Sequence, residues 1–178
     1  MVEKEQVHAK GRVVKAFGNL LQVEFEGNIR QGEVAMVDVD RSQLKAEVIE
    51  IVGNEAKIQV FEDTRGIKLG SPVHFSGDLL EAELGPGLLS SIFDGLQNPL
   101  VNIADQSGFF LPRGLYLPVL DRKRHWDFER VAKVGDLLSR GEPIGTVLEG
   151  RFHHQIMLPF SFYGIYTLTW IITDGSSV

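Results

Sequence analysis

Phosphate chemistry is the first possibility raised by the glycine-rich stretch EAELGPGLLSSIFDGLQNPL, residues 81–100. A nucleotide cradle of the P-loop kind needs the pattern G-x-x-x-x-G-K-[S/T], because backbone N–H groups and the lysine contact the phosphates. The stretch supplies glycines, but no Gly-Lys-Ser or Gly-Lys-Thr triplet occurs anywhere in the 178 residues. The sequence therefore excludes nucleotide binding of this kind, and we expect these residues to bind no cofactor.

Acid–base and nucleophilic chemistry are the next possibilities in the same stretch. Glu81 and Glu83 are two residues apart, so a strand would place both carboxylates on one face, where a pair could transfer protons. An exposed polar face is the commoner reason for such spacing. Ser90 and Ser91 lie near Asp94, but nothing marks a histidine as their base, and no G-x-S-x-G pattern is present. We interpret the two hydroxyls as helix-end groups and assign no catalytic residue.

A calcium loop is suggested by DVDRSQLKAEVI, residues 38–49. Asp38, Asp40 and Ser42 take its first, third and fifth positions. Gln43 stands in place of the turn glycine, however, and Ile49 in place of the bidentate glutamate. We therefore expect the two aspartates at the solvated end of a strand, without calcium.

Zinc is suggested by His153 and His154, with His125 elsewhere. Adjacent histidines on a strand point to opposite faces, and no acidic residue sits at ligand spacing. We favour a surface or partner-facing pair, and the sequence predicts no metal site.

The segment KVGDLLSRGEPIGTVLEG, residues 133–150, is similar to the lipoyl and biotinyl carrier domains. Those domains form a hammerhead, a flattened β-sandwich, and present a modifiable lysine at a tight hairpin tip. The residues that follow here, RFHHQIMLP, contain no lysine. The resemblance implies the fold without the carrier chemistry. A stand-alone β-rich binding module related to carrier domains is the alternative function.

Strands must position most of these side chains. From Gly11 to Phe75, short apolar runs alternate with turns, and LLQVEFE places Leu21, Val23 and Phe25 on one face. Six short strands in about 65 residues favour a small closed barrel, because closure removes exposed edges. Further strands are expected at residues 34–39 and 45–52, and turns at Gly18-Asn19, Gly27-Asn28 and Gly53-Asn54, the last a type II′ hairpin.

The second half of the chain is also β-rich and forms a second unit of about 65 residues. Its prolines disfavour a long helix, and YTLTWIIT, residues 166–173, alternates as a strand does. Trp126 and Phe128 are two residues apart in HWDFE, so we expect both on one buried face. A turn or two around residues 88–93 is the best helix candidate.

Composition limits the classes of partner. The formal net charge of −6 and the pI of about 5.4 repel phosphate backbones, so no nucleic acid is expected. The chain has no cysteine, which excludes disulfides and cysteine–zinc sites. The polar start MVEKEQVHAK lacks the apolar core of a signal peptide, and no run of about 18 apolar residues occurs. We expect no membrane insertion.

AELGPGLLSSIFDGLQNPL, residues 82–100, resembles a segment of the catalytic A subunit of V-type and archaeal-type rotary ATPases. Further landmarks keep the family's order: KAEVIEIVGNEAKIQVFEDTRGIKLGSPV before this segment, and FLPRGLYLPVLDRKRHWDF, KVGDLLSRGEPIGTV and HHQIMLP after it. The resemblance therefore covers nearly the whole chain. The family-motif residues are Glu83, Leu84, Gly85, Pro86, Gly87, Phe93, Asp94, Gly95, Pro112, Arg113, Gly114, Asp121, Arg122 and Trp126.

The resemblance implies a mainly β fold with two folded parts. A six-stranded barrel at residues 10–76 would follow a flexible lead at 1–9. Residues 77–109 would be the connecting limb of a nucleotide-binding domain that is otherwise missing. Residues 110–173 would be the bulge, a flattened sandwich inserted only in A subunits, and 174–178 a truncated tail. On this interpretation the chain is an N-terminal fragment.

The resemblance also implies partners and an activity for the full subunit. That subunit hydrolyses or makes ATP, as Mg-ATP, and is coupled to proton or sodium transport. The barrel would join B subunits in an alternating hexamer around a central rotor, and the bulge would contact the peripheral stalk. The family's P-loop and catalytic glutamate have no counterpart here, so we carry over no catalytic, cofactor or metal residue. We expect the fragment to be inactive alone, and the parent to be cytoplasmic and peripheral on the membrane.

A basic cluster is the candidate for stalk contact. DRKR supplies Arg122, Lys123 and Arg124, and Arg151 follows later in the bulge. In a chain of net charge −6 such a cluster could meet an acidic coiled coil. Solvated residues at a strand end are an equally good explanation, because each exposed ion pair contributes only about 0–1 kcal/mol.

Overall fold

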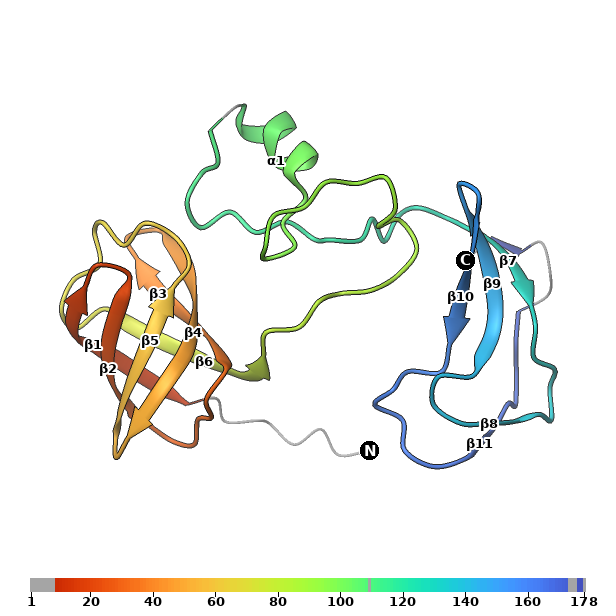
Figure 1. Cartoon of the computed structure of the whole chain (residues 1–178), viewed down its shortest axis with the longest axis horizontal. Helices are drawn as coiled ribbons and strands as arrows, with labels where there is room; N and C mark the ends of the chain where they lie inside the picture. Colours follow the sequence, from red (N-terminus) through yellow and green to blue (C-terminus); the bar gives the residue numbers. More distant parts are fainter. Residues whose placement is uncertain (1–8, 109, 173–175, 178) are drawn as a thin grey trace. The chain divides into compact units, whose positions relative to one another are not determined.

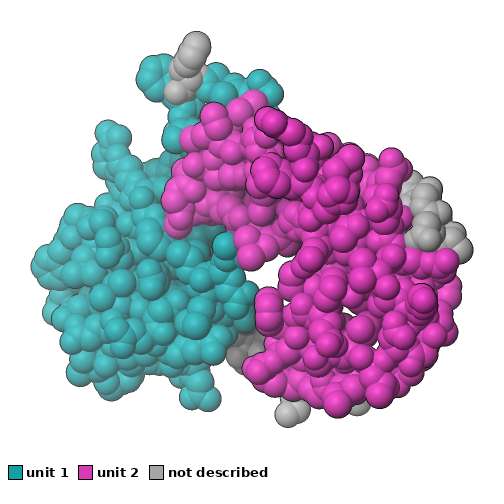
Figure 2. All heavy atoms as spheres, turned by 45° about the vertical axis from the view of Figure 1, so that its right-hand side comes forward, with its two compact units in different colours: residues 1–82, 103–116 teal, residues 83–102, 117–178 magenta. Residues whose placement is uncertain are grey.

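The computed structural model describes residues 9–108, 110–172 and 176–177 (Figure 1). The chain divides into two compact units, residues 1–82 with 103–116 and residues 83–102 with 117–178 (Figure 2). The predicted lead and tail fall largely outside the described residues, although Ala9 is buried. The domain boundaries expected from the sequence stay predictions.

The first unit contains the predicted six-stranded barrel. Its strands are hydrogen-bonded in the order β1-β2-β5-β4-β3-β6, and β6 pairs with β1 to close the sheet. Closure pairs the edges that an open sheet would expose. The strands are β1 (Lys10–Phe17), β2 (Leu20–Glu26), β3 (Glu33–Val39), β4 (Ser42–Val52), β5 (Glu55–Val60) and β6 (Pro72–Leu79).

Apolar alternation explains the core of the barrel. Every second residue of β3 and β5 is buried, as the period of a strand requires when one face is dry. The enclosed side chains form one apolar cluster, in which Phe75 is among the largest. Its ring lies 6.0 Å from that of Phe25 in an edge-to-face arrangement. Burial of this cluster is the main source of the barrel's stability.

Short glycine turns set the register of the barrel hairpins. Gly53 has a φ of 62°, and Asn54 is not among the residues with positive φ, which agrees with the predicted type II′ turn between β4 and β5. Gly18 has a φ of 64° in the turn between β1 and β2. The register of β4 shifts between Val48 and Glu50, so a β-bulge explains why the alternation blurs there in the sequence.

The second unit contains a four-stranded sheet in the order β10-β9-β7-β12 and a two-stranded sheet, β11-β8. Phe128 on β7 is buried as predicted, whereas Trp126 is only half-buried. The strands are β7 (Asp127–Arg130), β8 (Leu137–Leu138), β9 (Pro143–Glu149), β10 (Phe152–Met157), β11 (Tyr166–Thr167) and β12 (Ser176–Ser177).

The predicted helix at residues 88–93 is wrong. Ser90 has a φ of 65°, in the left-handed region, which interrupts a right-handed helix. The helix is α1 (Leu100–Ser107), which begins after Pro99 and ends where the Gly108 N–H bonds the Ala104 carbonyl at 2.7 Å. Proline before the start and glycine after the end were the signals available in the sequence. Among the described residues no helix is long and apolar enough to span a bilayer.

The predicted strand at residues 166–173 is wrong at residues 168–172, and Thr173 lies outside the described residues. Only Tyr166 and Thr167 pair with β8, and Leu168 bonds the backbone of Gly135 and Asp136. Gly135 has a φ of 98°, so the backbone before β8 turns at this residue and forms no further ladder with residues 169–172. Trp170 is consequently 73% exposed, not buried as alternation suggests.

Candidate functional site

The motif residues belong to two separate clusters, one in each unit. Pro112, Arg113 and Gly114 lie in the first unit, with the barrel. The other motif residues lie in the second unit. Each cluster consists mainly of hydrogen bonds between side chains and backbone, so its chemistry has to be judged from those contacts.

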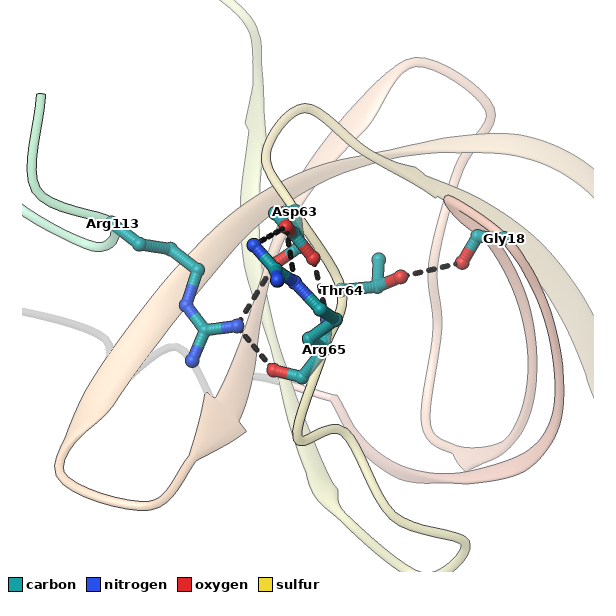
Figure 3. Close-up of polar contacts among 5 residues, drawn as sticks. All are labelled: Gly18, Asp63, Thr64, Arg65 and Arg113. Atoms are coloured by element: carbon teal, nitrogen blue, oxygen red, sulfur yellow. Dashed lines mark hydrogen bonds and ion pairs between the residues drawn. The ribbon is translucent and has the colours of Figure 1, made fainter.

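In the first cluster, Arg113 contacts the loop after β5. Its Nη1 donates to the Asp63 carbonyl oxygen at 3.1 Å and to the Arg65 carbonyl oxygen (Figure 3). Within that loop, Thr64 Oγ1 donates to the Gly18 carbonyl oxygen at 2.7 Å. One guanidinium thus satisfies two loop carbonyls, which a lysine could not do with the same planar geometry.

The neighbouring Gly114 and Tyr116 contact the carboxylate of Glu62. The Gly114 N–H donates to Glu62 Oε2 at 2.7 Å, and the Tyr116 hydroxyl donates to Oε1. The same hydroxyl accepts the Lys45 N–H at 2.7 Å. We name residues 112–116 the strap, because these bonds attach the segment to the barrel. The motif search missed Glu62 and Tyr116, whose pairing spans 54 positions and has no local signal.

Gly114 is required at its position for two reasons. Its φ is 71°, where a side chain is strained. A Cβ would also lie 2.9 Å from the Gln43 carbonyl oxygen and 2.9 Å from the Ser42 Cβ. The Arg113-Gly114 pair of the strap is therefore explained by attachment to the barrel.

An ion pair in the loop after β5 changes the titration of its partners. The side-chain hydrogen bond from Arg65 lowers the pKa of Asp63, and the backbone N–H of Arg65 lowers it further. The same side-chain bond raises the pKa of Arg65. Arg65 Nε lies 2.6 Å from Asp63 Oδ2, and Nη2 lies 2.6 Å from the same oxygen. Both side chains are solvent-exposed, so the pair orders the loop and adds little stability.

In the second cluster, Glu83 bonds to Gln97 through its backbone and to Arg122 through its carboxylate. The Gln97 side-chain amide donates to the Glu83 carbonyl at 2.7 Å and accepts the Glu83 N–H at 2.7 Å, as a paired strand would. The Glu83 carboxylate forms an ion pair with Arg122. Glu83 is therefore engaged in structure, and the acid–base pairing with Glu81 has no support in these contacts.

Asp94 closes a tight loop. Its Oδ1 accepts the N–H groups of Leu96 at 2.9 Å and Asn98 at 2.8 Å, and its Oδ2 accepts the Asn98 amide at 2.8 Å. These bonds are typical of an aspartate that stabilises a turn. Ser91 Oγ donates to the Gly87 carbonyl oxygen at 3.4 Å and does not form part of a nucleophilic pair with Asp94. The interpretation of the serines as helix-end hydroxyls is wrong, because residues 88–93 are not helical.

Glu149 joins two distant parts of the second unit. Its Oε1 accepts the N–H groups of Gly87 at 2.7 Å and Leu89 at 2.9 Å, and His154 Nδ1 lies 3.2 Å from its Oε2. His153 is exposed on the other side of β10, as expected for adjacent histidines. Sequence reasoning missed Glu149, because only the β9–β10 hairpin brings it beside His154.

The basic residues proposed for stalk contact differ in what they touch. Arg122 pairs with Glu83, and the Arg124 guanidinium lies 4.0 Å from the centre of the Trp126 ring. Lys123 and Arg151 are exposed, and the structure gives their charged groups no partner among the described residues. A role in stalk contact stays a prediction for all four.

The residues that suggested a calcium site or a carrier hairpin make ordinary side-chain contacts or lie at a turn. Asp38 accepts the Gln43 amide at 2.8 Å and lies 3.1 Å from His74 Nε2. The described part of the chain holds no group of three or more residues suited to a metal ion. The β9–β10 hairpin, where a carrier domain would present lysine, has Gly150 and Arg151 at its tip.

Comparison with known proteins gives matches to two domain models along the chain. Residues 13–77 match the ATP synthase alpha/beta family, beta-barrel domain. Residues 117–177 match the ATPsynthase alpha/beta subunit barrel-sandwich domain. The two matches correspond to the closed barrel of the first unit and to the strands of the second.

Several V-type ATP synthase alpha chains are similar to this chain over nearly all of its length. That of Protochlamydia amoebophila is 72% identical over 173 residues, which are 97% of this chain and 29% of the relative. Those of Chlamydia muridarum and Chlamydia trachomatis serovar L2 are 57% and 56% identical over 98% and 99% of this chain. The chain spans about 29–30% of the length of these relatives. With both of its β domains matched in order, the chain belongs to the ATP synthase alpha/beta family and corresponds to the N-terminal region of a V-type ATP synthase alpha chain.

Proposed function

We propose that the chain is the N-terminal part of the catalytic subunit of a V-type ATPase or ATP synthase. In this proposal the parent subunit hydrolyses or makes ATP as its Mg²⁺ complex, coupled to proton or sodium transport. The chain itself contributes assembly, through the barrel and the bulge, and no catalytic group. The observation that carries the proposal is the 72% identity to a V-type ATP synthase alpha chain over 97% of this chain.

Each unit has a proposed partner. The barrel takes its place in a ring with B subunits, in an alternating hexamer around the central rotor. The bulge, residues 110–173, contacts the peripheral stalk. The parent works on the cytoplasmic side, attached to the membrane through the assembled ATPase. The side-chain contacts described above give the motif residues a structural role within this chain, because they fix loops and the strap.

The assembly proposal is tested by native purification of the full-length gene product through an affinity tag. We expect B subunits, rotor and stalk subunits to co-purify, together with hydrolysis of Mg-ATP. A full-length product that purifies as a single chain without ATP hydrolysis would contradict the proposal and favour the stand-alone binding module.

The stalk contact is tested by charge reversal at residues that have no structural role. Lys123→Glu with Arg151→Glu should weaken stalk binding several-fold at low salt, and the difference should shrink as salt screens beyond about 8 Å. Arg122 is left unchanged, because its reversal would also break the ion pair with Glu83. Lys133→Glu, an exposed lysine of the same unit, is the matched control. Equal affinity of variant and control at both salt concentrations would exclude a docking role.

A further inference from the structure

Among the described residues of the second unit, Glu149 is the buried carboxylate, with a residue exposure of 5%. It is the last residue of β9, immediately before the hairpin tip. Its Oε1 accepts two backbone N–H groups, from Gly87 at 2.7 Å and from Leu89 at 2.9 Å, across 62 and 60 positions of sequence. A charged acceptor makes these bonds stronger than bonds to a neutral group.

The second oxygen of Glu149 is held from the other arm of the hairpin. His154 Nδ1 lies 3.2 Å from Oε2, and the His154 side chain is 29% exposed. In the tautomer that carries its hydrogen on Nδ1, His154 donates this bond to the carboxylate oxygen. The carboxylate is thus tied to β10 on one side and to residues 87–89 on the other.

The segment that Glu149 holds has a backbone that needs support. Gly87 has a φ of 108° and Ser90 a φ of 65°. Such a conformation costs free energy for a non-glycine residue and persists only where surrounding contacts fix it. The two N–H groups that bond to Glu149 lie just before the strained Ser90. The carboxylate therefore helps to hold the backbone of this segment in its conformation.

The same segment lines one of two neighbouring cavities of the second unit, to which Gly87 and Ser90 contribute. Pro86 lines both of them, and Asp121 and Arg124 complete the shared border. The smaller cavity, about 330 Å³, also contains Ser90 and Ser91 in its lining. The larger, about 430 Å³, is lined mostly by apolar side chains, including Trp126, Phe128, Ile144, Ile156 and Trp170.

We propose that Glu149 is a clamp that couples the β9–β10 hairpin to residues 87–90, which form part of the wall of the smaller cavity. When the hairpin is displaced, the carboxylate leaves the N–H groups of Gly87 and Leu89, and the wall relaxes from its strained conformation. Displacement of the wall in turn removes the interactions that hold Glu149 in its buried place, because coupling between two sites is reciprocal. The clamp is a property of the second unit alone and does not depend on the proposed assembly.

Amide hydrogen exchange on the whole chain tests the clamp residue by residue. In Glu149→Ala, the Gly87 and Leu89 amides should exchange roughly ten- to hundredfold faster, because both lose a charged acceptor. The Val147 amide, in the ladder of β9, should change far less. Glu149→Gln keeps a neutral acceptor and should restore part of the protection. Glu129→Gln, an exposed glutamate on β7, is the control and should leave all three rates unchanged.

A second variant displaces the hairpin without altering any clamp residue. Two glycines inserted between Gly150 and Arg151 should speed exchange at Gly87 and Leu89 several-fold. The same insertion between Gly53 and Asn54 of the barrel should not. Unchanged exchange at Gly87 and Leu89 in both the alanine and the insertion variants would overturn the clamp. Equal acceleration at Val147 would also overturn it, since Glu149 would then only stabilise the unit as a whole.

Discussion

Gly145 on β9 should be intolerant of even one added methyl group. A Cβ at this position would lie 2.1 Å from Phe128 Cζ, 2.2 Å from Phe128 Cε2 and 2.7 Å from the Glu129 carbonyl oxygen. All three distances are shorter than real Cβ contacts, so Phe128, which is only 4% exposed, has to move, and the open space beside it is the apolar cavity that it lines. Gly145→Ala must therefore push β7 away from β9 or expel the ring.

The expected cost follows from these two outcomes. Overpacking of a dense core costs about 1–3 kcal/mol, and loss of a buried phenylalanine costs about 3–5 kcal/mol. The φ of Gly145 is not positive, so alanine regains about 0.4–1 kcal/mol by restricting the unfolded chain. We expect Gly145→Ala to lower the free energy of unfolding of the second unit by about 2–4 kcal/mol.

Urea denaturation followed by tryptophan fluorescence measures this cost selectively. Both tryptophans of the chain, Trp126 and Trp170, lie in the second unit, so their emission reports that unit and not the barrel. Gly95→Ala is the matched control, since nothing lies within 4 Å of its added Cβ and its φ is not positive either.

Compensation by a shorter side chain gives a further check. Phe128→Leu removes the ring atoms nearest to the added methyl group but leaves the Glu129 carbonyl in place. Placed in the Gly145→Ala background, it should therefore cost about 0.5–3 kcal/mol less than in the wild type. A fluorescence-detected midpoint of Gly145→Ala equal to that of Gly95→Ala would refute the packing argument.

Three further predictions concern the first unit and the whole chain. Gly114→Ala should destabilise the barrel and strap by about 1–3 kcal/mol, because of its positive φ and the 2.9 Å approach to Gln43, as measured by far-ultraviolet circular dichroism in urea; an unchanged midpoint would contradict this. Arg65 lowers the pKa of Asp63 below its ordinary value of 3.8, so the folded state is stabilised above pH 3.8 and loses this stabilisation as the pH falls through the lowered pKa. Asp63→Asn should make the urea midpoint depend less on pH in this acid range, and an unaltered pH dependence would contradict the assignment. Calorimetry of this chain with Mg-ATP should give no saturable isotherm, because no Gly-Lys-Ser/Thr triplet is present; a micromolar isotherm would show a nucleotide site of another kind.

The barrel could be predicted from the sequence because its signals are local. Alternation along LLQVEFE sets one face of β2 towards the core. The Gly53-Asn54 turn sets the antiparallel pairing of β4 with β5. Even the blurred alternation near Ile49 had a local cause, a β-bulge. The wrong helix at residues 88–93 shows the limit of such signals, because Ser90 has a positive φ and the nearby Gly87 and Leu89 N–H groups bond to Glu149, some 60 positions away.

The sequence by itself determined that the chain is β-rich, that its first part closes into a barrel and that its motifs follow one family's order. Each of these depends on residue period, turn chemistry or motif order, which neighbouring residues carry without tertiary information. Only the tertiary structure decided what the motif residues do: Arg113 and Gly114 attach the strap to the barrel, and Gly87 bonds to Glu149. These contacts join a side chain to backbone groups some 50 or 60 positions away, a separation at which no periodic pattern links the two partners.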